Sequence, residues 1–187
     1  MNNSKPRIDG YLESDIRICL QKNEDTYLER FRKLPDQKFN FCAAIFGSKW
    51  FAYRLMVKEG FILWFLEMLL SAVSGTIFLF LGIKRIIAME TIIIWLKISG
   101  IVIYLIFFSV QGFIADQIYW NRLKKKLNDV NRCESLVPAS AEVREKLEAQ
   151  TGVSVGCMIV LSILWGIINK LVLKLIMFPV AYWAIRP

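Results

Sequence analysis

Histidine is absent from this 187-residue chain, and cysteine and proline are sparse. Without imidazole there is no histidine general base, no Ser-His-Asp triad and no histidine metal ligand. The four cysteines lie far apart and form no Cys-x-x-Cys pair, at Cys19, Cys42, Cys133 and Cys157. This spacing argues against a zinc or haem-attachment site and against a secreted disulfide framework. We therefore expect reduced thiols and no bound cofactor or metal.

The first 60 residues also lack the apolar run of a cleavable signal peptide, so we expect internal segments to direct insertion into a membrane. The chain is 56% hydrophobic with a mean hydropathy of +0.44, both high for a soluble domain. Most of the charged residues fall in residues 1–60 and 121–150, and the net charge is +8. Positive charge flanking apolar runs is typical of topology signals and of attraction to anionic lipid headgroups. We expect lipid partners and no nucleic-acid partner.

The apolar runs predict an all-α integral membrane protein. We expect about three transmembrane helices, a short helical cytoplasmic N-terminal segment and interfacial helices. Five regions follow along the chain: a cytoplasmic helical preamble (1–38), an aromatic and basic interfacial collar (39–60), a transmembrane hairpin (61–120), a basic cytoplasmic connector (121–150) and a C-terminal transmembrane or interfacial helix (151–187).

In the preamble, apolar residues near helical spacing predict a short amphipathic helix, at Ile8, Tyr11, Leu12, Ile16 and Leu20. Asn23 precedes two acids and is predicted to cap a second helix, which ends near Pro35. These helices either pack on each other, lie on the headgroups, or form a docking surface for a partner.

In the collar, Asn40 is predicted to cap a helix that starts at Phe41, and Gly47-Ser48 is predicted to bend it. Aromatic rings and snorkelling cations favour the headgroup level. We therefore expect an interfacial anchor made of Trp50, Tyr53, Arg54 and Lys58, with the two cations one helical turn apart on one face.

The first span is predicted over Phe61–Gly82, and Glu67 is its one ionisable residue. A tight turn over Ile83–Ile86, with Lys84 and Arg85, should follow it. The next apolar stretch is too long for one span and too short for two. We interpret it as an interfacial or tilted segment to about Lys97 and then a span to about Tyr119.

Asp116 falls near the end of that second span, at a depth comparable with Glu67. Two carboxylates there would form a proton or cation site, or would face water independently.

Within the connector, Ser140 begins a predicted charged helix, and beyond the connector the last span is expected from Val153 to about Leu173. The remainder, with Tyr182 and Trp183, is predicted to be an interfacial tail, with a re-entrant segment or second crossing as the alternative. Small residues one turn apart predict close helix packing in three pairs, Ser71 with Gly75, Gly152 with Gly156, and Ser162 with Gly166.

Short-loop charges predict the orientation. The segments around 49–58 and 122–132 are rich in Lys and Arg, whereas the opposite ends of the spans carry few. The positive-inside rule then places the N-terminus in the cytoplasm, and three spans place the C-terminus outside. An even number of spans would reverse only the C-terminus.

The collar also carries a family resemblance. Its motifs are Asn23-x3-Tyr27-x3-Phe31, Phe39-Asn40-Phe41-x-Ala43-Ala44-x-Phe46-Gly47, Trp50 and Tyr53-Arg54-x-Met56. Over roughly residues 23–127 the chain resembles a family of small bacterial inner-membrane proteins catalogued as a domain of unknown function. That family shows Asn-Trp-x-Ala-Phe-Phe-x-Gly, then Trp and Tyr-Arg-Lys-Met, then two apolar spans, and a Gly and a Tyr ahead of a basic segment, similar to Gly112, Tyr119 and Arg122–Lys126 here. Phe41 and Leu55 depart from the pattern, and the region beyond 130 lies outside it.

With no catalytic constellation in the sequence, we expect a non-enzymatic membrane protein that acts through protein or lipid contacts, with a membrane-protein partner or a second copy of itself. One alternative is a small transporter or channel-forming oligomer that uses Glu67 and Asp116. A third is a membrane-embedded enzyme that acts on lipid.

Overall fold

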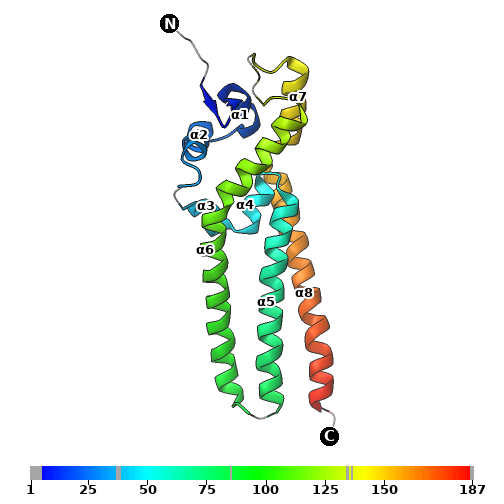
Figure 1. Ribbon diagram of the computed structural model, residues 1–187. Helices are drawn as coiled ribbons and strands as arrows, with labels where there is room; N and C mark the ends of the chain where they lie inside the picture. The colour runs from blue at the N-terminus through cyan, green and yellow to red at the C-terminus, as the bar shows by residue number, and fades with distance from the viewer. Residues whose placement is uncertain (1–5, 37–38, 85, 134, 136, 186–187) are drawn as a thin grey trace.

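Three long helices dominate the computed structural model, which describes residues 6–36, 39–84, 86–133, 135 and 137–185. They are α5 (Val57–Ile83), α6 (Met89–Asp129) and α8 (Val155–Ile185), and α5 lies between the other two and contacts both (Figure 1). All three are long and apolar enough to cross a membrane. This confirms the predicted all-α membrane protein with three candidate spans.

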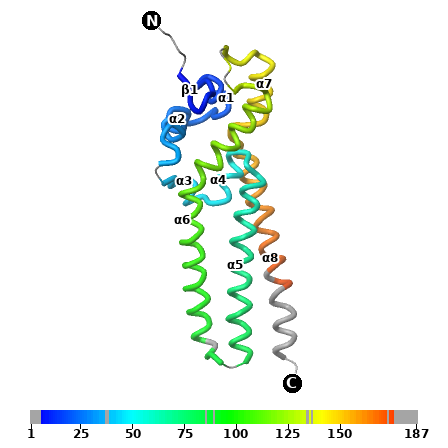
Figure 2. The backbone as a smooth tube through the Cα atoms, in the orientation of Figure 1, coloured from blue at the N-terminus to red at the C-terminus, as the bar shows by residue number. Residues whose placement is uncertain are grey.

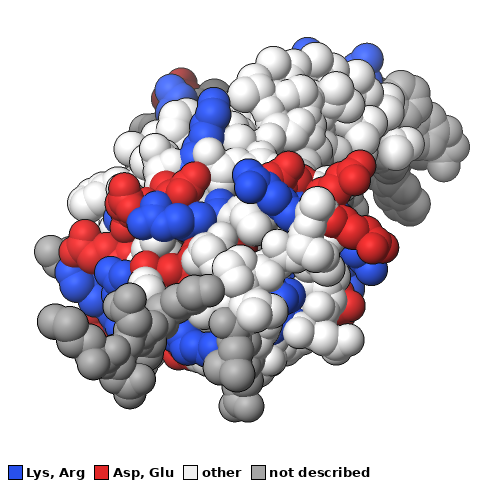
Figure 3. Space-filling model, turned by 90° about the horizontal axis from the view of Figure 1, so that it is seen from above, with Lys and Arg blue, Asp and Glu red and all other residues white. Residues whose placement is uncertain are grey.

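The remaining elements form a second layer at the end of the bundle near the N-terminus (Figure 1). We call this the headpiece; it contains β1 (Arg7–Ile8), β2 (Tyr11–Leu12), α1 (Glu13–Leu20), α2 (Glu24–Arg32), α7 (Ala141–Gln150) and the end of α6 from Ala115 onward. The other part, α5, α8 and α6 up to Gln111, is the stem. Seen from above, Lys and Arg side chains intersperse with Asp and Glu over the headpiece (Figure 3).

The headpiece begins with a hairpin, not with the predicted helix. β1 and β2 pair antiparallel, with Ile8 opposite Tyr11, and helix starts only at Glu13. Asp9 and Gly10 between the strands both have positive φ, which matches the twist of a two-residue hairpin turn. The Asn23 prediction was also wrong in its mechanism: Asn23 precedes α2 in a left-handed conformation, but its side chain makes no capping bond.

The predicted apolar stripes of this segment are buried against α6. Ile16, Leu20, Leu28 and Phe31 belong to one core with α6 and α7 residues, chiefly Tyr119, Trp120, Leu123, Leu127 and Leu147. Phe31 stacks on Trp120 with ring centroids 4.8 Å apart. Of the alternatives for the preamble, helices packing on one another is the arrangement seen.

The prediction that residues 86–97 form a separate interfacial segment was wrong. α6 is one continuous helix of 41 residues, roughly 60 Å long at 1.5 Å per residue. It starts at the foot of the bundle and ends inside the headpiece (Figure 2). A bilayer core is only about 30 Å thick, and the excess length of α6 is accommodated because the helix leaves the stem and its last part, from Ala115 onward, lies in the headpiece.

The other two helices of the stem, α5 and α8, are each continuous. α5 ends at Ile83, consistent with the predicted turn; Lys84 follows it, and Arg85 lies outside the described residues. α8 continues to Ile185 as one helix, so the expected change to an interfacial tail near Leu173 does not occur in the backbone. The side chains of Tyr182 and Trp183 lie outside the described part.

The four glycines predicted to pack helices together do not do so. A Cβ built on Gly75 or Gly166 meets nothing within 4 Å, and one on Gly156 meets only the Ser154 hydroxyl at 3.9 Å. Gly152 precedes α8 in a left-handed turn beside the Gln21 side chain, so it is not a helix-packing residue either. The glycine at a true close approach in α5 is Gly60, whose added Cβ would lie 2.9 Å from the Ser48 carbonyl oxygen.

Candidate functional site

Two short helices cover the stem where it meets the headpiece, and we call them the roof. They are α3 (Phe41–Phe46) and α4 (Ser48–Tyr53). The Asn40 side chain caps α3 as predicted, accepting a hydrogen bond from the Ala43 amide at 3.0 Å. The predicted bend is at Gly47, where φ is +56° and an added Cβ would lie 2.8 Å from Gln111 Oε1. Glycine is therefore required both for the backbone and for the close approach to α6.

Asn40 and Asp116 fasten this roof to α6. The Asn40 amide donates to the Gly112 carbonyl at 2.8 Å, and Asn40 Nδ2 donates to Asp116 Oδ1 at 2.6 Å. Asp116 Oδ2 accepts from Arg30 of α2 at 2.7 Å, and Asp116 is 0% exposed. Asp116 thus joins α2, the roof and α6, and both its oxygens are occupied by protein donors.

The predicted interfacial anchor was largely wrong, because its strongest members are buried in the protein. Arg54 is 3% exposed and Trp50 is 5% exposed. The Arg54 guanidinium lies 4.3 Å from the centre of the Tyr27 ring and donates to the Leu20 carbonyl at 3.2 Å. A cation–π contact and a carbonyl replace the headgroup that was expected to hold this cation.

Arg54 and Lys58 also do not share a helical face. α4 ends at Tyr53 and α5 begins at Val57, so the chain turns between the two cations. Tyr53 is half-buried, and Lys58 alone of the four is exposed. Apolar exposure in the roof instead belongs to α3, at Phe41, Ile45 and Phe46.

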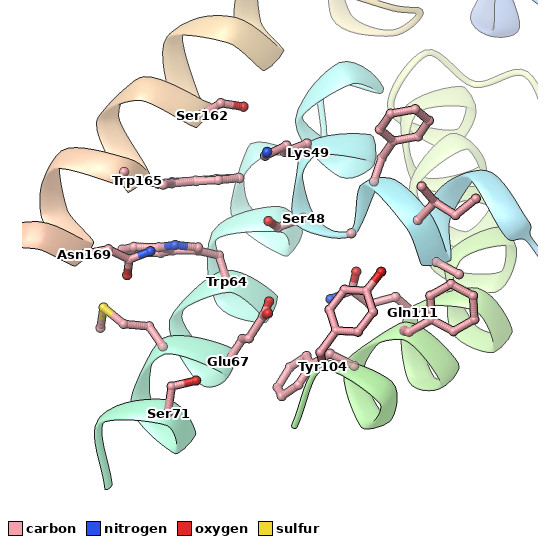
Figure 4. A pocket seen from close by; sticks show the side chains of 18 of the residues that line it. Ser48, Lys49, Trp64, Glu67, Ser71, Tyr104, Gln111, Ser162, Trp165 and Asn169 are labelled. Atoms are coloured by element: carbon pink, nitrogen blue, oxygen red, sulfur yellow. The ribbon is translucent and has the colours of Figure 1, made fainter. Parts of the chain in front are cut away.

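Beneath the roof, α5, α6 and α8 line a half-open cavity of about 540 Å³ (Figure 4). Its apolar wall includes Met68, Ala72, Phe107, Phe108 and Val172. Its polar lining includes Ser48, Lys49, Glu67, Ser71, Gln111, Ser162 and Asn169. Trp64 and Trp165 stack between α5 and α8 with ring centroids 5.7 Å apart. The lining is therefore amphiphilic, with ionisable groups of both signs.

Opposite charges reach this cavity from two elements. In Figure 4 the Glu67 carboxylate points from α5 into the space towards Gln111 and Tyr104, and Lys49 lies on the roof side. Neither makes an ion pair or a hydrogen bond with another described residue. An acid at this depth is costly to leave without a partner, so Glu67 is the functional candidate of the stem.

Two neutral polar atoms of the lining are also left without partners. Gln111 is 1% exposed, and its Oε1 accepts no hydrogen bond from the described residues. The buried Trp64 Nε1 likewise finds no acceptor among them. Each unpaired buried polar group costs about 1–3 kcal/mol. Because neither atom has accessible surface, both face protein atoms and not the open space of the cavity, and Gln111 Oε1 lies against Gly47.

The shared site expected for Glu67 and Asp116 does not form. Asp116 is bonded to Arg30 and Asn40 and is not part of the cavity lining, whereas Glu67 is. Three residues predicted to pack helices, Ser71, Ser162 and Gly166, line the cavity instead.

Sequence reasoning passed over Gln111, Trp64 and Trp165 as functional residues. Gln111 had a usable signal, since it is an amide inside a long apolar run. Asn169 and Lys49, which also line the cavity, were not predicted as functional residues either. These residues come together because α6 and α8 pack on either side of α5. The spacing of residues along the sequence does not reveal this packing.

No group of three metal-binding side chains occurs among the described residues. Outside the cavity, buried or half-buried acids are held in pairs, Asp15 with Arg132 at 2.7 Å and Glu59 with Arg122 at 3.2 Å. Burial raises the pKa of the Cys19 thiol to about 12, which keeps it protonated and unreactive.

In the comparisons with known proteins, no family model, no curated protein and no solved structure matches the chain.

Proposed function

We propose that this chain is a non-enzymatic, multi-pass membrane protein that acts through protein or lipid contacts in the bilayer, and that its cavity holds a lipid-like amphiphile. The single observation that carries this is the amphiphilic cavity beneath the roof. It combines an apolar wall with two charged groups of opposite sign, Glu67 and Lys49, that pair with no described residue. A small soluble metabolite would not use the apolar wall, and a plain hydrocarbon would leave the charged groups unpaired.

The distribution of paired and unpaired charges supports a binding role. Asp116, Asp15 and Glu59 are each paired with an arginine of the protein, whereas Glu67 and Lys49 of the cavity pair with no described residue. The transport alternative requires Asp116 to act together with Glu67, and the Arg30 pairing of Asp116 counts against it. The resemblance to the bacterial family of unknown function remains a prediction beside this proposal.

We also propose that the headpiece lies in the cytoplasm of a bacterial cell and the stem in its inner membrane. Lys49, Arg122 and Arg132 lie at the headpiece end, whereas Lys84 and Lys97 lie at the opposite end of the stem. Arg85 and Arg186 lie outside the described residues. A reporter fused after Pro187 is expected to read as periplasmic. A cytoplasmic reading would overturn this orientation.

Photocrosslinking tests the cavity. The chain would be placed in nanodiscs that contain a phospholipid with a diazirine on its acyl chain, and crosslinked residues would be located by mass spectrometry. We expect crosslinks on cavity residues such as Tyr104 and Phe107, in addition to the general labelling of lipid-facing helices.

A matched pair of glycine variants separates the cavity from the helix surface. Gly166 lines the cavity and Gly100 does not, yet a Cβ at either position meets nothing within 4 Å. Gly166→Phe should therefore fill the cavity and lower its crosslinking by about tenfold, and Gly100→Phe should leave it unchanged. Equal crosslinking of cavity residues in both variants would refute the proposed amphiphile site.

A further inference from the structure

Two consecutive helices of the chain expose opposite kinds of side chain. In α2 the apolar residues Tyr27, Leu28 and Phe31 are buried, and the residues that reach the surface are polar or charged. In α3 this order is inverted, because the small Ala43 and Ala44 are the buried residues. The exposed residues of α3 are Phe41, Cys42, Ile45 and Phe46. None of these four side chains carries a charge, an oxygen or a nitrogen, so the outward face of α3 offers water no strong hydrogen bond.

Phe39 connects this face to α6. Its ring lies 4.9 Å from that of Phe41 and 5.0 Å from that of Phe113, measured between ring centroids. The Asn40 amide donates to the Gly112 carbonyl at 2.8 Å, which holds the start of α3 at the level of Phe113. A side chain on Gly112 would overlap the Phe39 ring, so the glycine allows this ring to lie against α6. Phe39, α3 and α6 therefore present one apolar surface.

That surface continues down the stem. The large exposed apolar side chains of α6 run from Ile93 to Phe113, and Lys97 near the foot is the one charged residue of this stretch. The stretch is roughly 30 Å long at 1.5 Å per residue, which is about the thickness of a bilayer core. Beyond Phe113 the exposed residues of α6 are Asn121, Lys125, Asn128 and Asp129. This change marks the level at which acyl chains give way to headgroups, and α3 lies on its apolar side.

We infer that the outward face of α3, together with Phe39 and Phe113, is immersed in the acyl chains of the leaflet on the headpiece side. The headgroups then lie between α3 and α2, where the exposed side chains change from apolar to charged. α3 fixes how deeply the chain sits in the bilayer, because moving it outward would expose its apolar side chains to water. This inference rests on the proposed placement of the stem in a membrane, and it is independent of what the cavity holds.

Continuity with the stem favours lipid over a protein partner as the occupant of this face. A protein interface has an apolar centre and a polar rim around it. The face of α3 has a polar border only towards α2 and the headpiece, at the junction seen in Figure 1. On the other side it runs without a border into the exposed apolar side chains of α6, such as Val110 and Ile106. Acyl chains cover such a surface without requiring it to end.

Spin labels on the native cysteines test the inference. Cys42 lies on the outward face of α3, Cys133 is exposed beyond the end of α6, and Cys19 is buried and stays unlabelled. One sample carries a nitroxide on Cys42, with Cys133→Ser and Cys157→Ser. A second carries it on Cys133, with Cys42→Ser and Cys157→Ser. A third carries it on Ile106→Cys of α6, with all three accessible cysteines replaced by Ser.

EPR relaxation then reports what surrounds each label in the full-length chain, in vesicles of phosphatidylcholine and phosphatidylglycerol. Oxygen is enriched in acyl chains, whereas a neutral nickel chelate stays in water. We expect the ratio of oxygen to nickel accessibility at Cys42 to lie within about twofold of that at Ile106→Cys and to exceed that at Cys133 by about tenfold, because the bilayer core excludes the polar chelate.

The other outcomes overturn different statements. High nickel accessibility at Cys42, with Ile106→Cys in lipid, would place α3 in water and refute this inference alone. High nickel accessibility at both positions would refute the membrane placement of the stem as well. Low accessibility to both reagents at Cys42 would mean that a second copy or another protein covers α3, which also refutes the inference.

A charge on α3 tests whether its apolar face holds it in the bilayer. Phe41→Asp, in the sample labelled on Cys42, should raise nickel accessibility there by about tenfold, because a carboxylate is costly among acyl chains and draws the helix outward. Val137→Asp is the matched control and should change nothing at Cys42, since Val137 is 65% exposed outside the stem and Phe41 is 64% exposed. Unchanged accessibility after Phe41→Asp would contradict the inference. If that variant does not fold, the comparison of Cys42 with Ile106→Cys, which leaves Phe41 in place, still decides.

Discussion

The headpiece and the stem use similar residues in opposite ways. In the headpiece, buried acids are matched to bases, as in Asp116 with Arg30 and Asp15 with Arg132, and the aromatic rings pack on one another. In the stem, apolar side chains face outward along all three long helices, and the ionisable Glu67 stands without a partner. One helix, α6, belongs to both parts.

This difference separates stability from function. In the proposed placement, water surrounds the headpiece, so each buried charge there requires a partner from the protein itself. The stem would lie where lipid replaces water, so its apolar exposure would cost nothing, and an unpaired charged group there would point to a ligand. Substitutions in the two parts should therefore have different consequences.

The largest expected contrast is between two acids. Asp116→Ala should lower the free energy of unfolding by about 3 kcal/mol, because it leaves Arg30 and Asn40 without their shared partner. Glu67→Ala should change stability by less than about 1 kcal/mol, since no described residue bonds to it. Thermal unfolding of both variants in the same detergent measures this. Comparable losses would mean that Glu67 is structural and that the contrast between the parts is false.

Two glycines of α5 give the next contrast. A Cβ at Gly60 would lie 2.9 Å from the Ser48 carbonyl oxygen, whereas one at Gly75 meets nothing within 4 Å. Gly60→Ala should therefore destabilise the protein by about 1–3 kcal/mol through overpacking. Gly75→Ala should be neutral or should stabilise it by up to about 1 kcal/mol, because alanine is the better helix former. The same unfolding assay applies, and a loss at Gly75 would show that this part of the stem is packed against something else.

Thiol chemistry probes the headpiece core without changing its stability at neutral pH. Cys19 is buried and Cys133 is exposed. The raised pKa of Cys19, about 12 against an ordinary 9.0, means that the folded state holds its proton more tightly than the unfolded state. A maleimide at pH 7 should label Cys133 at least tenfold faster than Cys19.

The sign of the pH effect follows from the same shift. Between about pH 9 and pH 12 the unfolded thiol loses its proton while the folded one keeps it. Cys19 therefore contributes a loss of stability as the pH rises through this window, and none below it. Replacing Cys19 by Ala should remove that part of the alkaline destabilisation. Rapid labelling of Cys19 at pH 7 would contradict its burial.

The smallest effect is expected on the exposed surface of the headpiece. Arg144 and Glu148 form an exposed pair one helical turn apart on α7, at 2.8 Å. Arg144→Ala should cost no more than about 0.5 kcal/mol, because solvent and salt screen such pairs. If Arg144→Ala destabilised the protein as much as Asp116→Ala, burial would not determine how much an ion pair of the headpiece contributes to stability.

Local signals in the sequence predicted local structure well. Asn40 caps α3, the backbone bends at Gly47, and the Ser140 side chain caps α7. Each of these depends on residues within three positions of one another. The three candidate spans were equally accessible, because sustained apolar length is visible without any knowledge of tertiary contacts.

Long-range contacts account for most of what the sequence did not predict. Arg54 matched the pattern of a headgroup anchor, but its environment is made by Tyr27 and Tyr119, distant in the chain. The break expected near Lys97 rested on the thickness of a bilayer, and it failed because α6 has a headpiece to enter. The cavity could not be predicted at all, since it depends on the order in which α5, α6 and α8 are arranged.

The continuity of α6 has a mechanical consequence. A helix without a break transmits tilt along its whole length. If the part of the helix in the bilayer changes its tilt angle by about 10°, a point about 30 Å further along the helix axis moves by about 5 Å. The Gln111 side chain lies on this lever arm below the headpiece core that grips Tyr119 and Leu127. Thinning or thickening of the surrounding bilayer, by changing the inclination of α6, would therefore displace the headpiece relative to the membrane surface.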